Sequence, residues 1–296
     1  VNDMSGTASW ITDASGSQEV DMASKRTLSN FLTWAQKQYN TSADHTLLLL
    51  CDHGAGPYTN LKSADRAMCC DNTSAVRNGC IMSTDFPWVF ENAGYGTAKR
   101  LAMIFTDTCM EMAAEEAYEF KDYAHYYMGS QNSEYSIAFC GKEIMTSFVN
   151  TLPNDDDVLR SLAINEINAQ KSRLSAKEYI QKDAWANHLA CCKDKTFGGK
   201  TFYSSLINYI SDSDGLTVPT YSCIDMTKLD DVVKAADTLA GVISGDSEHG
   251  KYIIDNYLRS TSPAGNTLMY GGVNNQFDLG FFAYKVKEYA DSIGAT

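Results

Sequence analysis

The sequence predicts an α/β protein with a mostly parallel central sheet and a helical C-terminal part. Two apolar runs, Leu47–Cys51 and Leu101–Thr106, are short and end at polar residues, which is typical of strands covered on both faces. Helical patterns alternate with strand patterns over 1–150, and mostly helical patterns follow over 151–296. We therefore expect an α/β core over the first range and a mostly helical part over the second, packed together as one structural unit.

Few regular patterns precede the second apolar run. Residues 1–20 are polar, and apolar residues at helical spacing then predict an amphipathic helix over Thr27–Tyr39. Residues 55–80 show no clear periodicity and are rich in small and polar residues, which predicts a long surface loop. A second helix is expected over Thr84–Asn92, capped by its own first residue or by Ser83.

The second apolar run leads into a region of mixed patterns. A helix is expected from Met110 to Lys121, with three glutamates in its first turns, where carboxylates suit the helix dipole. Further strands are expected at His125–Met128, Ser136–Cys140 and Pro219–Cys223. The remaining helical patterns cover residues 142–150, 155–171, 175–190, 201–211, 227–243, 247–259 and 279–292.

The net charge of −13 at pH 7 argues against nucleic-acid binding, which needs a basic surface. An acidic surface supports solubility and attracts basic substrates. No apolar run approaches the ~20 residues of a membrane-spanning helix, and the mean hydropathy is −0.29. The chain opens at Val1 without a signal-peptide pattern, so we expect it to be cytoplasmic or already processed.

The nine cysteines are an odd number without the spacing of a disulfide scaffold, in a chain too long to need such cross-links. We expect most of them to be small buried apolar side chains, as at Cys51 and Cys140, which end apolar runs. The adjacent pairs at 69–70 and 191–192 lack the C-x-x-C spacing of a zinc site. The sequence therefore predicts no zinc site.

Cys109 differs from the other cysteines in its setting. It follows the second strand and lies where the next helix is expected to begin, so that unpaired backbone N–H groups and the helix dipole would lower its pKa. Its neighbours Asp107 and Thr108 are polar, as an opening to solvent requires. An inert buried thiol is the alternative interpretation, and the pattern by itself leaves both open.

His53 has the corresponding place after the first strand. Asp52, His53 and Gly54 end the apolar run, and glycines at 54 and 56 let the backbone approach a ligand closely. If the two strands are parallel neighbours, His53 and Cys109 arrive at the same edge of the sheet, where ligands bind in such folds. A lone loop histidine has no such role, but a histidine beside a cysteine is the arrangement of a thiol nucleophile and its proton acceptor.

Other catalytic motifs are absent from the sequence. There is no GxxxxGK[ST], no GxGxxG that opens a helix, no HExxH and no GxSxG. The acidic run Asn154–Asp157 fits a helix N-terminus and lacks the ligand spacing of an EF-hand calcium loop.

The two strand ends resemble those of the clostripain family of cysteine peptidases, which have the caspase–gingipain type of fold. The family's D-H-G strand end reads here as residues 52–54, and its D-x-C-x-M strand end reads as residues 107–112 (DTCMEM), with the methionine register slightly altered. The helix before the histidine strand is also similar, at residues 27–35 (TLSNFLTWA). Together with the later segments 224–226 and 277–283, the resemblance covers residues 19–145 well and the rest loosely.

The resemblance implies a three-layer caspase-like sandwich that carries a catalytic dyad. Cys109 would be the nucleophile and His53 the general base and acid. The N–H groups of Gly54 and Cys109 would bind the tetrahedral oxyanion. No cofactor is implied, and the calcium dependence of some relatives finds no matching ligands in this sequence.

The resemblance also implies cleavage after Arg or Lys, because family members read the P1 side chain in an acidic pocket. Asp107 fits the wall of such a pocket. Ser130, Gln131 and Glu134, on the turn expected after the next strand, are further candidates for it.

Family members tend to cut themselves between the histidine and the cysteine. The corresponding 58–80 loop holds Lys62, Arg66 and Arg77, and we expect cleavage after one of them. We therefore expect a secreted or cell-surface bacterial peptidase that acts on peptides or proteins with a basic P1 residue. The alternatives are a peptidase of the same fold with another P1 residue, such as Asn, and a catalytically silent binding module.

Overall fold

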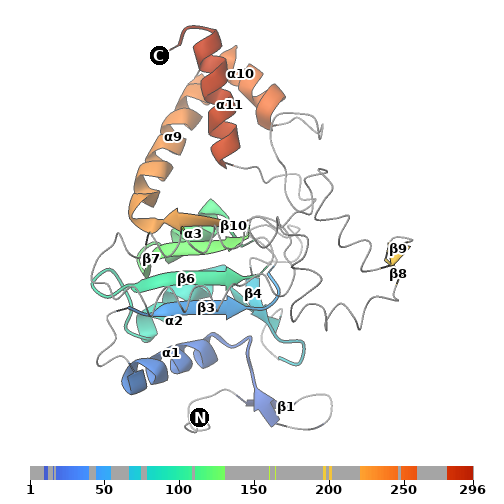
Figure 1. Ribbon diagram of the computed structural model, residues 1–296, viewed down its shortest axis with the longest axis vertical. Coiled ribbons are helices and arrows are strands. Elements are labelled where there is room, and N and C mark those ends of the chain that lie inside the picture. The colour runs from blue at the N-terminus through green and yellow to red at the C-terminus, as the bar shows by residue number, and fades with distance from the viewer. Residues whose placement is uncertain are drawn as a thin grey trace.

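A computed structural model of the chain describes the segments drawn as ribbons in Figure 1. The described residues are 10–12, 16, 18–39, 45–54, 67–74, 79–108, 111–130, 160, 164, 196–197, 200–201, 221–245, 248–258 and 279–295.

The centre of the fold is a four-stranded sheet in the order β10-β7-β6-β3 (Figure 1). Strands β3 (Leu47–Cys51), β6 (Leu101–Asp107) and β7 (Ala124–Ser130) are parallel, and β10 (Tyr221–Asp225) pairs antiparallel with β7. The α/β class and the mostly parallel sheet are therefore confirmed. The fourth strand comes from the second half of the sequence, far from its partner along the chain.

Strands β3 and β6 differ in burial. Every residue of β6 is buried, as is expected of a strand that is covered on both faces. In β3 burial alternates: Leu48 and Leu50 are each 5% exposed, whereas Leu49 is 38% exposed. Cys51 is also exposed, so its prediction as a buried apolar side chain is wrong, because it follows the outward-facing period of β3.

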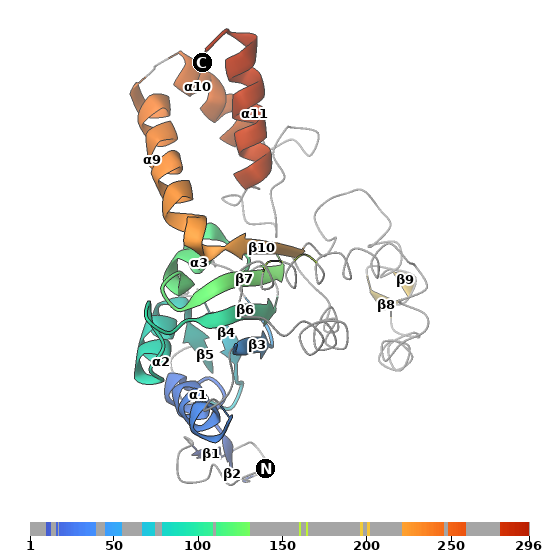
Figure 2. The same cartoon turned by 60° about the vertical axis from the view of Figure 1, so that its left-hand side comes forward.

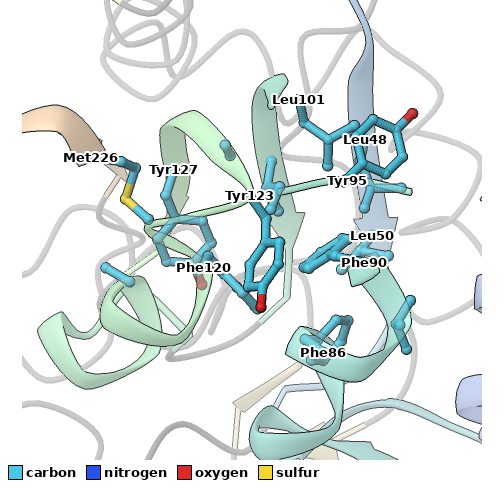
Figure 3. Close-up of a cluster of buried hydrophobic side chains, with 14 of the residues drawn as sticks. Leu48, Leu50, Phe86, Phe90, Tyr95, Leu101, Phe120, Tyr123, Tyr127 and Met226 are labelled. Atoms are coloured by element: carbon cyan, nitrogen blue, oxygen red, sulfur yellow. The ribbon is translucent and has the colours of Figure 1, made fainter. Parts of the chain in front are cut away.

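Helices α1 (Lys25–Tyr39), α2 (Phe86–Asn92) and α3 (Ala114–Phe120) lie together on one face of the sheet (Figure 2). They share one apolar core with the inward residues of β3, β6 and β7. Aromatic rings form its middle: Phe120 meets the rings of Phe86, Phe90 and Tyr127 edge to face, with centroids 5.1–5.9 Å apart (Figure 3). This core holds the three parallel strands in register.

The start of α2 differs from the predicted one. A 3₁₀ turn, η2 (Ser83–Asp85), comes first, and Asp85 takes the N-cap position without a side-chain cap hydrogen bond. Pro87 in the first turn of α2 needs no backbone N–H partner there. The predicted cap at Ser83 or Thr84 is therefore wrong.

The start of α3 is also later than predicted. The helix begins at Ala114 rather than Met110, because Met112 N–H donates to the carbonyl of Ser130 (3.0 Å) and Ala113 is extended. Helix α3 thus begins five residues after Cys109, so the predicted helix start at Met110 is wrong. Cys109 itself lies outside the described residues.

The predicted 55–80 loop contains a hairpin at its C-terminal end. Strand β4 (Ala67–Cys70) pairs antiparallel with β5 (Cys80–Met82), and a disulfide joins Cys70 to Cys80. The prediction of a long surface loop is wrong for this part, and so is that of a chain without disulfide cross-links. The reason is tertiary: Ala67, Met68 and Ile81 are at most 2% exposed, buried by neighbours distant in sequence.

Two further hairpins are small, β1 (Trp10–Thr12) with β2 (Gln18–Val20) and β8 (Thr196–Phe197) with β9 (Lys200–Thr201). The sequence patterns did not predict them. The strand expected at 136–140 and the helices expected at 142–150, 155–171, 175–190 and 201–211 lie almost wholly outside the described residues.

The C-terminal helices are confirmed close to their predicted bounds. They are α9 (Leu229–Gly245), α10 (His249–Ile253), which continues as the π-helical η4 (Ile254–Leu258), and α11 (Leu279–Ser292). Ile253 and Phe282 form their own small core. A short 3₁₀ turn, η3 (Met226–Lys228), connects β10 to α9. Among the described helices, none is both long and apolar enough to cross a membrane.

Candidate active site

The carboxyl ends of β3 and β6 are level with each other. Cys51 is the direct partner of Asp107 in the parallel ladder, and Asp52 N–H continues it by donating to the Asp107 carbonyl (3.3 Å). His53 and Cys109 therefore each come two residues past the same rung of the sheet. This register is what a histidine and a cysteine acting together need, although Cys109 itself lies outside the described residues.

His53 lies between two residues whose backbones are held. Asp52 is hydrogen-bonded to β6, and Gly54 forms an antiparallel bridge with Met68 of β4. The His53 side chain is exposed. A fixed backbone with an exposed imidazole is a suitable arrangement for a group that must meet a substrate.

The chain that follows Cys109 is held to β7. The Tyr127 hydroxyl donates to the carbonyl of Glu111 (2.7 Å), and the bond from Met112 to Ser130 follows immediately. Thr108 and Glu111, on either side of residues 109–110, are 1% and 0% exposed. Burial raises the pKa of Tyr127 well above its ordinary value, so its hydroxyl keeps the proton that it donates.

Asp107 is a buried carboxylate at the same edge. It is 7% exposed, and the Cys51 thiol donates to its Oδ2 (3.4 Å). Its Oδ1 has no hydrogen-bond partner among the described residues. A buried carboxylate oxygen without a donor is a favourable place for a cationic or hydrogen-bonding group.

Of the other residues predicted for the pocket, the structure describes one and leaves two undescribed. Ser130 lies at the end of β7 rather than on a turn, and it is fully buried. It follows Gly129, the partner of Thr106, just as Asp107 follows Thr106, so it belongs to the same edge. Gln131 and Glu134 lie outside the described residues, as do Lys62, Arg66 and Arg77.

Cys69 shows how closely β4 approaches this edge. Burial raises the pKa of its thiol to about 12, with smaller contributions from the negative charges of Asp52 and Glu111. The thiol therefore stays protonated, and chemically inert, at neutral pH. Cys69 also has a positive φ of 56°, at the point where the β4–β5 ladder is irregular.

A sequence model of the clostripain family matches residues 4–291. The chain belongs to the clostripain family.

Three of the solved structures similar to this clostripain-family chain come from two bacteria. An inactive zymogen C11 protease from Parabacteroides distasonis is 18% identical, with a TM-score of 0.49 over 89% of this chain and 55% of that one. A secreted C11 cysteine protease from Bacteroides thetaiotaomicron, in complex with an irreversible peptide inhibitor, is 15% identical, with a TM-score of 0.47 over 94% and 63%. The structure titled iotapain, from the same organism, is 13% identical, with a TM-score of 0.49 over 93% and 64%.

The chain thus spans 55–64% of the length of these solved structures. No curated protein matches it.

Three features near this edge of the sheet could not be read from the sequence patterns used above: the β4–β5 hairpin, its disulfide, and Tyr127 as a donor to the segment after Cys109. For the hairpin there was a signal, since Asp71 and Gly79 lie just inside Cys70 and Cys80 and are turn-forming residues. For Tyr127 there was none, because its partner is a backbone carbonyl chosen by the tertiary fold. Within the described residues, no group of three or more His, Cys, Asp or Glu side chains could hold a metal ion.

Proposed function

We propose that the protein is a cysteine endopeptidase in which Cys109 is the nucleophile and His53 the general base and acid. The observation that supports the proposal is the rung between Cys51 and Asp107, because His53 and Cys109 each follow that rung by two residues along the chain. Membership of the clostripain family supports it. A silent binding module of the same fold would need neither residue.

The chemistry follows from those roles. Cys109 transfers its thiol proton to His53, and the thiolate attacks the carbonyl carbon of the scissile bond. The N–H groups of Gly54 and Cys109 donate to the oxyanion that develops. His53 then returns the proton to the leaving amine, and water, deprotonated by His53, hydrolyses the thioester and restores the thiol.

We infer that the P1 residue is Arg or Lys and that Asp107 binds it. Its burial and its Oδ1 without a described partner support this role, since a guanidinium or ammonium would supply the missing donor. Ser130 lies at the same edge, and Gln131 and Glu134 are proposed as additional pocket residues. A neutral P1 residue such as Asn would leave the carboxylate charge unpaired.

We also propose self-cleavage in the 58–80 loop, after Lys62, Arg66 or Arg77. The disulfide makes cleavage at these sites distinguishable, because Arg77 lies between Cys70 and Cys80 in the sequence and the other two residues do not. Cleavage after Arg77 would leave two fragments that stay joined by the disulfide and separate only on reduction. Cleavage after Lys62 or Arg66 would leave fragments that part in denaturant alone. Electrophoresis with and without reductant distinguishes the two, and an intact loop in fully active enzyme would refute self-cleavage.

The wider setting is proposed on the same grounds. The acidic chain would act on peptides or proteins with a basic P1 residue, as a secreted or cell-surface bacterial enzyme. Residues 1–150 and 151–296 would form one structural unit, since β10 of the second range is hydrogen-bonded to β7 of the first.

The test is selective alkylation combined with substitution. Iodoacetamide at neutral pH should modify Cys109, located by peptide mass spectrometry so that it is told apart from the exposed Cys51. Modification of Cys109 should remove turnover of Arg and Lys peptides in step with its extent. Full activity after complete modification of Cys109 would refute the assignment.

A further inference from the structure

The position of His53 depends on the β4–β5 hairpin as well as on the central sheet. On one side Asp52 is held by β6, and on the other Gly54 is held only through its bridge to Met68, among the described residues. Met68 is fully buried. We call the carboxyl ends of β3 and β6, with the residues that follow them, the catalytic edge. In Figure 1 β4 lies beside these strand ends, so the hairpin reaches the catalytic edge from outside the sheet.

The hairpin in turn has a weak point at Cys69. Ala67 and Met68 pair with Met82 and Ile81, and the ladder is then interrupted at Cys69, whose φ is positive. A bulge of this kind leaves one residue unpaired and disrupts the local hydrogen bonds. Beyond it, pairing resumes only at Cys70.

The disulfide lies just past this weak point. Cys70 and Cys80 are ladder partners and are covalently joined, and Asp71 N–H donates to the Gly79 carbonyl (2.6 Å). A Cβ on Gly79, where φ is +61°, would lie 2.7 Å from the Asp71 carbonyl oxygen, so the turn is closely packed. The cross-link therefore holds β4 to β5 directly beside the interruption at Cys69.

At its other end, the hairpin is joined to the apolar core. Strand β5 contains Ile81, 1% exposed, and leads through η2 into α2, whose Phe86 is 0% exposed. Met68 belongs to the same core and pairs directly with Ile81, so a path runs from the core through β5 and Met68 to Gly54 and His53. The disulfide fastens the hairpin two residues beyond Met68.

We propose that the Cys70–Cys80 disulfide is a positioning element for His53 and Gly54, holding β4 so that Met68 fixes the backbone of the catalytic edge. The proposal rests on the function proposed for His53 and Cys109. The central sheet and α2 are buried independently of this cross-link, which closes a loop of only ten residues along the chain. Its removal should therefore act locally, on the catalytic edge.

The experiment compares the full chain with the double variant Cys70→Ser with Cys80→Ser. Cys223→Ser is the matched control, because Cys223 is a free, half-buried cysteine on β10. We expect kcat for an Arg peptide to fall about tenfold or more in the double variant while KM changes little. The pH profile for alkylation of Cys109 should move to higher pH, because a displaced imidazolium no longer stabilises the thiolate.

A second measurement does not depend on activity. Amide hydrogen exchange at residues 48–54 should become about tenfold faster in the double variant, whereas residues 101–107 should be unchanged. Unchanged kinetics, pH profile and exchange would overturn the proposal, and so would faster exchange spread evenly over both segments. If the full chain itself cleaves no peptide, the proposed function fails, and the exchange at 48–54 still decides whether the disulfide positions this edge.

A second double variant covers the case in which serines prevent folding. Cys70→Ala with Cys80→Val keeps apolar side chains in the ladder and removes only the covalent bond. The same local increase in exchange at 48–54 supports the proposal, and its absence overturns it.

Discussion

The carboxyl ends of β3 and β6 carry the two proposed catalytic residues but are supported in different ways. The end of β6 is central and buried: Asp107 and Thr108 are 7% and 1% exposed, and the chain beyond is held by Tyr127 of the neighbouring strand. The end of β3 is more open, with Cys51 and His53 exposed, and its outer support comes from a disulfide-linked hairpin.

The two strand ends therefore differ in how firmly they are held and by which parts of the fold. The proposed nucleophile follows a strand that is buried throughout, and the proposed proton acceptor follows a strand whose end is held locally by the hairpin. Changes near β6 should therefore disturb the whole core together with catalysis, whereas changes near the hairpin should disturb catalysis more than overall stability.

The largest expected effect is the loss of either dyad member. Cys109→Ala and His53→Ala should each lower kcat on Arg peptides by about 10⁴-fold or more, since the thiolate requires both groups. Steady-state kinetics on a fluorogenic peptide measures this. His45→Ala, a histidine before β3, is the control and should retain activity; substantial turnover by His53→Ala would mean that another group accepts the proton.

Asp107→Asn should have the next largest effect, and a selective one. We expect kcat/KM to fall by about 10²- to 10³-fold for peptides with Arg or Lys at P1, and by less than about tenfold for a neutral P1 residue. The control is Asp122→Asn, whose carboxylate is half-exposed beside Arg100. An equal loss on both kinds of peptide would place Asp107 outside the P1 pocket.

Tyr127→Phe tests the support of the β6 end. Losing the hydrogen bond to the Glu111 carbonyl should lower the free energy of unfolding by about 1 kcal/mol and reduce kcat several-fold. Tyr123→Phe is matched to it, because that hydroxyl donates to the exposed Glu91 (2.8 Å), away from the catalytic edge. Denaturant unfolding and kinetics on both variants give the comparison, and a larger kinetic loss in Tyr123→Phe would contradict it.

The smallest effect concerns the two half-buried thiols, Cys69 and Cys223, whose pKa values burial raises to about 12. At pH 8 both should resist iodoacetamide while Cys51 reacts. Because the folded pKa exceeds the unfolded one, their contribution to stability is complete below about pH 9 and is lost as pH rises toward 12. The denaturant midpoint should fall over that window; modification of Cys69 at the rate of Cys51 at pH 8 would show that the hairpin does not cover it.

Much of this architecture could be predicted from local patterns. The strand predicted at Leu101–Thr106 followed from a continuous apolar run, and helix α1 and the C-terminal helices α9 and α11 followed from helical patterns. A strand buried on both faces is apolar throughout, and a helix that buries one face has apolar residues at the period of that face. The place proposed for the dyad follows from where two apolar runs stop. The direction of the sheet edge needed only the rule that ligands bind at the carboxyl ends of parallel strands.

Other features were decided by contacts between distant segments. The β4–β5 hairpin has almost no periodicity, because it is short, irregular at Cys69 and buried by other parts of the chain. The late start of α3 depends on a hydrogen bond to β7, and the exposure of Cys51 depends on which face of β3 is covered. No local pattern contains that information.

The sequence by itself thus determined the class of fold and the two residues to examine, since both depend on local composition and spacing. Only the tertiary structure decided that Cys51 and Asp107 form one rung, and that Asp107 is buried with one oxygen that has no donor among the described residues. The same holds for the disulfide in the hairpin that bridges to Gly54, next to His53. The physical reason is that register, burial and cross-links are relations between segments, and their energies arise only when those segments meet.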